Sequence, residues 1–329
     1  MLSALEVKEK MNYYGKELIP FLFVIDFEKE NGYFVDYPLK GNDILFSINS
    51  ITNCHNQIIN SYKQTENASN SYINSFPISF EDYEKKFDII HNGLFNGDSF
   101  LANLTLKTKI ETNLSLEEIF YRANSKYKIL VKDKFVCFSP ESFIKIKDNK
   151  ISTYPMKGTI DSSIPNAEKI ILNDYKETCE HNTIVDLMRN DLNMISSNVR
   201  VERFRYIDNL ITSRGGILQV SSEIIGDLDY DYYSILGDIF FRLLPAGSIS
   251  GAPKEATLNL IKNSELEKRG FYTGIFGYFD GKNLDSAVII RYIEKENEDY
   301  YFRSGGGVTI NSKAEDEYNE VINKIYLPF

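Results

Sequence analysis

The sequence predicts an α+β fold, because strand-like and helix-like segments occur in separate runs along the chain. Residues 127–154 alternate apolar and polar side chains around tight turns, a pattern typical of antiparallel strands. The segments after Ser79 and Ser115 instead carry apolar residues at helical spacing, and Ser115 with Glu118 forms a capping-box pattern. No segment repeats at a fixed period.

Composition and charge limit the possible functions. The chain has 329 residues, 43% of them hydrophobic and 13% aromatic, which is ample for the core of one large domain or two ordinary ones. The formal net charge of −10 argues against binding to nucleic acid or to an acidic membrane. An anionic substrate would therefore need a locally positive site.

Cysteine usage and hydropathy predict the compartment. Cys54, Cys137 and Cys179 are too few and too scattered for a disulfide framework, and Cys179 with His181 lacks the further ligands of a closed zinc site. The N-terminus has no signal-peptide pattern, and no apolar run approaches the roughly 20 residues needed to span a bilayer. We expect a cytoplasmic protein without a membrane partner.

Two features are expected near the N-terminus. Residues 20–39 predict a hairpin of two strands about Asn31-Gly32, which joins a larger sheet. The polar stretch 59–75 predicts a mobile connection.

The middle of the chain predicts an antiparallel meander over residues 127–154. Its last hairpin turns at Asp148-Asn149 and delivers Lys157, in YPMKGTI, to a sheet edge. A lone lysine after a strand is usually a solvated charge, so Lys157 alone does not indicate chemistry.

The rest of the chain is expected to alternate between helices and runs of strands. Its patterns predict, in order, a helix over 174–192, strands near 215–225, a helix around 231–243, a turn and helix at PAGSISGAPK, three strands over 274–303, the triplet Gly305-Gly306-Gly307 and a final amphipathic helix.

Two glycine-rich stretches suit an anion. In LLPAGSISGAPK, Gly247 and Gly251 precede Lys254 at a helix start, where backbone N–H groups and a lysine favour negative charge. The alternative is a turn that caps the helix. Residues 305–307 could aim amides at a carboxylate, and a tight turn explains them almost as well.

Carboxylates recur at helical spacing. Glu177 and Glu180 share one helix face, and Glu317 and Glu320 repeat the arrangement on the last helix. Such pairs could hold Mg²⁺, a hard cation that prefers oxygen ligands, or could be solvated helix faces. Glu141 in SPESF ends a strand beside the meander that carries Lys157, as an acid/base partner or a turn-exposed glutamate.

The chain resembles the chorismate-utilising enzymes from about Asp98 to its C-terminus. The resemblance rests on separated stretches that keep the family's order: SPESF, YPMKGTI, KETCEHNTIVDLMRNDL, LLPAGSISGAPKEA, RGFYTGIFGYFDG, SAVIIRYI, SGGGVTINS and EDEYNEVINK. The PxKGT variant is similar to that of aminodeoxychorismate synthase component I. The anthranilate synthase large subunit has alanine in place of this lysine, and isochorismate and salicylate synthases also lack it.

The resemblance implies an activity and assigns roles to residues. Lys157 would attack C2 of chorismate, Glu141 would protonate the departing C4 hydroxyl, and ammonia would enter at C4 to give 4-amino-4-deoxychorismate, a folate precursor. The lysine's pKa must then be depressed, or the lysine must lose its proton when substrate binds. Mg²⁺ would sit on the ring carboxylate, held by Glu180 and Glu320 with Glu177 and Glu317 nearby. The implied substrate-binding residues are Lys254, Tyr272, Arg291, Gly305, Gly306, Gly307, His181 and Thr159.

The resemblance also implies an architecture and a partner. It implies one chorismate-binding domain over residues 1–329, with two packed, largely antiparallel β-sheets flanked by helices, the site between the sheets and a shortened β-rich N-terminal part (about 1–75). The chain has no Cys-His glutaminase signature, so ammonia would come from a separate glutamine amidotransferase or from solution.

The sequence departs from the family pattern at four positions. Leu101 replaces a polar residue of the Gly-Asp-x-Tyr-Gln segment, Asn193 and Met194 replace a Leu-Gly-Arg continuation, and Gln219 stands where histidine is common. Two alternatives follow. The chain could be an anthranilate synthase large subunit, which Lys157 argues against, or a non-catalytic chorismate-binding relative.

Overall fold

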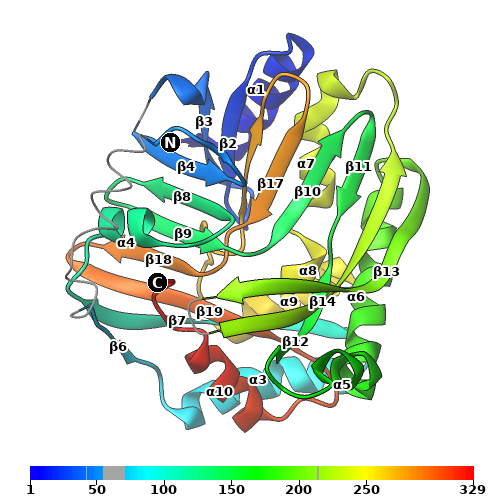
Figure 1. Cartoon of the computed structure of the whole chain (residues 1–329). Helices are drawn as coiled ribbons and strands as arrows, with labels where there is room; N and C mark the ends of the chain where they lie inside the picture. Colours follow the sequence, from blue (N-terminus) through cyan, green and yellow to red (C-terminus); the bar gives the residue numbers. More distant parts are fainter. Residues whose placement is uncertain (42, 55–70, 213–214) are drawn as a thin grey trace.

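The computed structural model describes residues 1–41, 43–54, 71–212 and 215–329. It shows two β-sheets with helices around them, and all strand pairs described are antiparallel, so the predicted α+β architecture is confirmed (Figure 1). The first sheet has the order β1 (Leu2–Ser3), β3 (Asn31–Asp36), β2 (Phe21–Ile25), β16 (Ile275–Phe279), β17 (Leu284–Val288), β10 (Ser142–Lys147), β11 (Lys150–Thr153), β14 (Gly215–Asp227) and β12 (Met156–Asp161), with β13 (Ser197–Thr212) also paired to β14.

The second sheet begins at β15 and ends at β5. Its order is β15 (Gly251–Ala252), β7 (Leu101–Thr112), β19 (Asp299–Val308), β18 (Tyr292–Glu296), β9 (Phe135–Ser139), β8 (Tyr127–Val131), β4 (Ile44–Ile48) and β5 (Ile51–Thr52), with β6 (Ile73–Phe76) also paired to β7. The helices are α1 (Ala4–Lys16), η1 (Pro38–Lys40), α3 (Phe80–Phe95), α4 (Leu116–Arg122), α5 (Ala167–Asn173), α6 (Tyr175–Asn193), η3 (Tyr232–Ile235), α7 (Leu236–Leu243), α8 (Gly247–Ser250), α9 (Lys254–Glu265) and α10 (Ala314–Asn323).

Strand β2 shows why the two sheets pack. Its five residues are all buried, and alternate side chains point to opposite faces of the strand. Phe21, Phe23 and Ile25 join the core beneath α1 and α7, whereas Leu22 and Val24 join a second core with side chains of β4, β8 and β9 from the other sheet. The first sheet is therefore covered by helices on one face and by the second sheet on the other.

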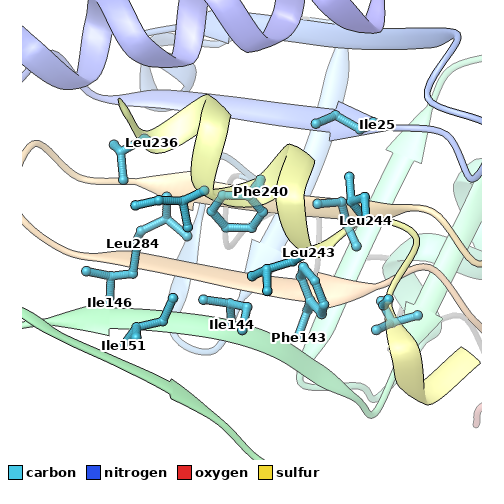
Figure 2. Close-up of a cluster of buried hydrophobic side chains, with 14 of the residues drawn as sticks. Ile25, Phe143, Ile144, Ile146, Ile151, Leu236, Phe240, Leu243, Leu244 and Leu284 are labelled. Carbon is cyan, nitrogen blue, oxygen red and sulfur yellow. The ribbon is translucent and has the colours of Figure 1, made fainter. Parts of the chain in front are cut away.

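Helix α7 covers the outer face of the first sheet. Phe240 and Leu243 pack against Phe143 and Ile144 of β10, and Leu284 of β17 belongs to the same cluster (Figure 2). Burying a side chain of this size contributes about 1.5–3 kcal/mol. On the second sheet, α3 and α9 pack on β7 and α10 packs on β19, while α4 packs on β8 and β9. Among the described residues, no helix has both the length and the apolar character needed to cross a bilayer.

Two N-terminal predictions need correction. Helix α1 was not expected in a β-rich segment, and it begins with a capping box of Ser3 and Glu6. The hairpin of β2 and β3 turns earlier than Asn31-Gly32, because the Asp26 carboxylate accepts backbone N–H groups of Glu30 and Asn31 and fixes the turn there. Most of the predicted mobile connection lies outside the described residues, and its end forms β6.

The predicted meander is divided between the sheets. Strands β8 and β9 belong to the second sheet, whereas β10 and β11 belong to the first, and the chain crosses between them at residues 139–142. Glu141 lies at this crossing. The hairpin at Asp148-Asn149 is confirmed, with both residues at positive φ.

The glycine triplet does not form a turn. Gly305, Gly306 and Gly307 lie inside β19 and pair with β7, so four strands follow Gly274 rather than three. A Cβ on Gly305 would lie 2.6 Å from the carbonyl oxygen of Leu104, which explains why glycine is needed in this strand.

Candidate active site

A cavity of about 620 Å³ opens between the two sheets. Strand β12 of the first sheet and strands β7 and β19 of the second contribute to its wall, together with α6, α8 and α10. Among the described residues, the basic and acidic side chains that line it are three cations and three carboxylates, namely Lys157, Arg291, Lys324, Glu141, Glu180 and Glu320. The locally positive groups that an anionic ligand requires are therefore present in an acidic chain.

Lys157 reaches the cavity because β12 is irregular. The pairing of β12 with β14 shifts register between Met156 and Thr159, and Gly158 within this bulge has φ +86°. A bulge of this kind redirects a side chain. The Nζ of Lys157 lies 2.7 Å from Oε2 of Glu180.

The Lys157 ammonium is stabilised by carboxylates. Burial by itself lowers the pKa of Lys157, but Glu180, Glu177 and Glu320 together outweigh burial and raise that pKa. The predicted depressed pKa is therefore wrong for the ligand-free protein. Loss of the proton when substrate binds stays a prediction.

The Glu141 carboxyl group lies at the cavity, and its surroundings favour the protonated form. It lines the cavity, and burial raises the pKa of its carboxyl group, against the opposing effects of Ser248, Arg291 and Lys324. Ser248 Oγ, on α8, donates a hydrogen bond of 2.9 Å to Glu141 Oε1. A carboxyl with a raised pKa keeps its proton at higher pH, as a general acid must.

Three of the four predicted carboxylates lie against two glycines. A Cβ on Gly158 would lie 3.1 Å from a carboxylate oxygen of Glu177, and a Cβ on Gly306 would lie 3.2 Å from Glu317 and 3.5 Å from Glu320. Glu180 and Glu320 line the cavity, while Glu177 and Glu317 do not. The two glycines allow α6 and α10 to bring these carboxylates close to the backbone of β12 and β19.

The chemistry of this donor set fits Mg²⁺. Within the part of the chain that the structure describes, no three His, Cys, Asp or Glu side chains form a ready-made metal site. Mg²⁺ does not need such a group, since it usually takes one or two carboxylates and completes its shell with waters and substrate oxygens. Glu180 and Glu320 are the carboxylates that could hold it at the cavity.

Lys324 was not predicted to form part of the site. This residue ends α10 and lines the cavity, and its Nζ lies 2.6 Å from both Glu320 Oε1 and the carbonyl oxygen of Gly305. Burial lowers its pKa. The available signal was its position four residues after Glu320, on the same helix face.

Tyr272 and Arg291 both line the cavity. Arg291 has φ +54° and its Nε donates to Tyr326 Oη at 3.2 Å. Tyr272 is buried, and its neighbour Thr273 has φ +58°. Positive φ at a β-branched threonine is rare and costs backbone energy, so its occurrence beside a cavity marks a constrained position.

Three predicted substrate-binding residues do not line the cavity. Lys254 Nζ donates to the carbonyl oxygen of Leu243 at 2.8 Å and lies 3.4 Å from Asp191. His181 is fully buried, with Nε2 2.7 Å from Ser222 Oγ, and burial lowers its pKa to about 4. Thr159 is exposed on β12.

The departures from the family pattern lie in different places. Leu101 is buried and lines the cavity, so an apolar side chain occupies that wall. Gln219 pairs with Thr159 in the neighbouring strand, outside the cavity. Asn193 and Met194 end α6.

Comparison with known proteins shows which family the chain belongs to. Residues 22–328 match the family described as chorismate binding enzyme. A relative from Haemophilus influenzae, named an uncharacterized PabA-like protein, is 50% identical over 323 residues, 97% of this chain and 95% of its own length. Aminodeoxychorismate synthase component 1 of Bacillus subtilis is 28% identical, over 76% of this chain and 55% of that protein.

Solved structures show the same fold. The anthranilate synthase component I of Streptococcus pneumoniae has a TM-score of 0.65 at 29% identity, over 77% of this chain and 58% of that one. The menaquinone-specific isochorismate synthase of Escherichia coli has a TM-score of 0.72 at 14% identity, over 98% of this chain and 81% of that one, a likeness of fold alone. The family match covers residues 22–328, and the Haemophilus influenzae relative is 50% identical over 97% of this chain. This chain therefore belongs to the chorismate binding enzyme family.

Proposed function

We propose that the protein is an aminodeoxychorismate synthase that converts chorismate and ammonia to 4-amino-4-deoxychorismate. The observation that carries the proposal is that Lys157 and Glu141, a nucleophile and a proton donor, line one cavity from different elements. The name of the Bacillus subtilis relative supports the same activity.

The proposed reaction has two displacement steps. The neutral amine of Lys157 forms a bond to C2 of chorismate, the two ring double bonds each shift one position toward C4, and the C4–O bond breaks. Glu141 gives its proton to the departing hydroxyl, which leaves as water. Ammonia then forms a bond to C4, the double bonds shift back, and the bond from C2 to Lys157 breaks, which restores the lysine. Because the ligand-free Lys157 is stabilised as an ammonium, substrate binding must lower its pKa before the first step.

The dianionic substrate would be held by cations and amides. Arg291 and Tyr272 are proposed to bind the pyruvyl carboxylate, since the planar guanidinium suits a carboxylate. The backbone of residues 305–307 and the Lys324 ammonium provide further polar contacts at the cavity. Mg²⁺ held by Glu180 and Glu320 would neutralise the ring carboxylate.

The proposal includes a partner and a compartment. Ammonia would come from a separate glutamine amidotransferase, and a separate lyase would complete 4-aminobenzoate for folate synthesis in the cytoplasm. The chain spans only about half the length of the Bacillus subtilis enzyme, so the activity and partners of that whole protein are carried over here as part of the proposal.

Anthranilate synthase is the second candidate. The Aquifex aeolicus anthranilate synthase component 1 is 33% identical over 58% of this chain, which covers 39% of that protein. Lys157 distinguishes the two candidates, because aminodeoxychorismate synthesis by the proposed route requires a nucleophile at this position. A non-catalytic chorismate-binding relative is the third.

Product analysis tests the proposal. The purified protein is incubated with chorismate, Mg²⁺ and ammonium at mildly alkaline pH, where free ammonia is available, and the products are separated and identified by mass. We expect 4-amino-4-deoxychorismate. Anthranilate as the main product would establish the second candidate, and chorismate binding without turnover, even with an amidotransferase present, would establish the third.

A further inference from the structure

The buried ion pair of Arg269 and Glu265 lies outside the cavity and takes no part in the proposed chemistry. Both side chains are almost fully buried, with 1% and 3% of their surfaces exposed. Arg269 donates to both oxygens of Glu265, through Nε at 2.8 Å and Nη2 at 2.6 Å. Its guanidinium also lies 4.6 Å from the ring centre of Phe27.

The other hydrogen bonds of the Arg269 guanidinium all go to residues of the cavity wall. Nη1 donates to the carbonyl oxygen of Ile249 at 3.0 Å and to Thr273 Oγ1 at 3.4 Å, and Nη2 donates to the carbonyl oxygen of Asn103 at 2.6 Å. Ile249, Thr273 and Asn103 line the cavity from three separate segments of the chain. One rigid guanidinium fork therefore connects three parts of the wall.

The pair also completes an interrupted sheet edge. On one edge of β7, β15 pairs with residues 101–102 and β6 pairs with residues 109–112, so the described strands leave the intervening residues unpaired. In this gap, Thr105 N–H donates to Glu265 Oε1 at 2.8 Å, next to the Arg269 contact with Asn103. The ion pair thus takes the place of a neighbouring strand, directly behind the stretch of β7 that pairs with Gly305–Gly307.

We propose that Arg269, oriented by Glu265, is a positioning residue that fixes the chorismate-binding wall by holding Asn103, Ile249 and Thr273 in place. Thr273 shows why such a contact is needed, because its positive φ is unfavourable and must be maintained by its surroundings. This inference rests on the proposed function, since it takes the cavity as the chorismate site.

Arg269→Lys is the test variant, because it keeps the charge but cannot reach all the acceptors of the fork. Arg303→Lys is the matched control. Arg303 is also buried and its Nε donates to Glu294 at 2.6 Å, but neither Glu294 nor its second partner Glu267 lines the cavity. Both variants should lower the melting temperature.

Chorismate binding separates the two variants. A displaced wall should raise the Kd and KM for chorismate by about tenfold or more in Arg269→Lys with a smaller effect on kcat, and by less than about twofold in Arg303→Lys. Titration calorimetry and steady-state kinetics are carried out well below both melting temperatures. The proposal is overturned if Arg269→Lys binds chorismate like the wild type, or if Arg303→Lys weakens binding equally.

A second variant tests the same inference if Arg269→Lys does not fold. Arg269→Gln combined with Glu265→Gln removes both charges together and leaves no unpaired buried charge. It should weaken chorismate binding in the same direction, and wild-type affinity in this variant would also overturn the proposal. A failure of the proposed function gives a different result from a failure of this inference. The wild type would then bind chorismate without forming aminodeoxychorismate, and the chorismate affinities of the wild type and the variants could still be compared.

Discussion

The Nζ of Lys157 lies 2.7 Å from Oε2 of Glu180, and this contact joins β12 to α6 inside the cavity. The two side chains are 32% and 13% exposed, so the pair is shielded from water far more than a surface ion pair. The group proposed as nucleophile is therefore held in place by a group proposed to hold Mg²⁺. This arrangement keeps the lysine charged until a ligand enters.

Substitution of Lys157 should remove the proposed reaction. Without the amine no bond to C2 can form, so we expect Lys157→Ala to lower aminodeoxychorismate formation by at least about 100-fold or to divert chorismate to anthranilate. Chromatographic product analysis measures this effect. Lys145→Ala is the matched control, because Lys145 also pairs with a carboxylate, Asp285, at 3.5 Å and is 27% exposed, yet lies outside the cavity. An unchanged rate in Lys157→Ala would show that ammonia attacks by another route.

The proton donor should be visible in the pH profile. Glu141→Gln cannot give a proton and should lower kcat by about 100- to 10,000-fold. The hydrogen bond from Ser248 lowers the pKa of Glu141, so Ser248→Ala should raise that pKa further. A general acid is active when protonated, so activity falls as pH rises through this pKa, and Ser248→Ala should move the alkaline limb of kcat/KM to higher pH. A shift to lower pH, or none, would count against Glu141 as the acid.

Turnover should depend on Mg²⁺, and substitution of a cavity-lining glutamate should weaken Mg²⁺ binding. We expect a chelator to abolish turnover and Mg²⁺ to restore it, and Glu320→Gln to raise the Mg²⁺ concentration for half-maximal activity by about tenfold or more. Glu315→Gln on the exposed face of α10 is the control and should behave like the wild type. Full activity in chelator would contradict a metal role for these carboxylates.

Local patterns in the sequence predicted the elements well. The capping box of Ser115 and Glu118 marks the start of α4, and Ser79 caps α3 as expected. Two interpretations of the glycine triplet were open from the sequence, and only the tight turn is wrong, because the glycines lie in β19 and allow close approach of β7 and α10 to that strand. Local pattern also could not reveal that a meander divides between two sheets, since strand partners are distant in sequence.

The site was predicted mainly through family motifs, and those motifs do not report side-chain direction. Lys157, Glu141, Tyr272 and Arg291 reach the cavity as expected. His181 follows Glu180 directly on α6, but its ring is buried against Ser222 of β14 and does not line the cavity. Lys324 was missed because its role depends on contact with Gly305 in another element.

Two lysines provide a final test of this placement. Lys254 was predicted to bind substrate, but its ammonium contacts Asp191 and the end of α7, whereas Lys324 lines the cavity. Lys254→Met removes the cationic partner of a mostly buried Asp191, so it should lower the free energy of unfolding by about 1–3 kcal/mol without changing the affinity for chorismate. Lys324→Met removes a charged partner from the cavity and should raise the KM for chorismate by about tenfold or more. Urea unfolding and steady-state kinetics on both variants measure these effects. If Lys254→Met instead raised KM at unchanged stability, Lys254 would have to turn toward the substrate in the complex, and its contact with Asp191 would belong only to the ligand-free protein.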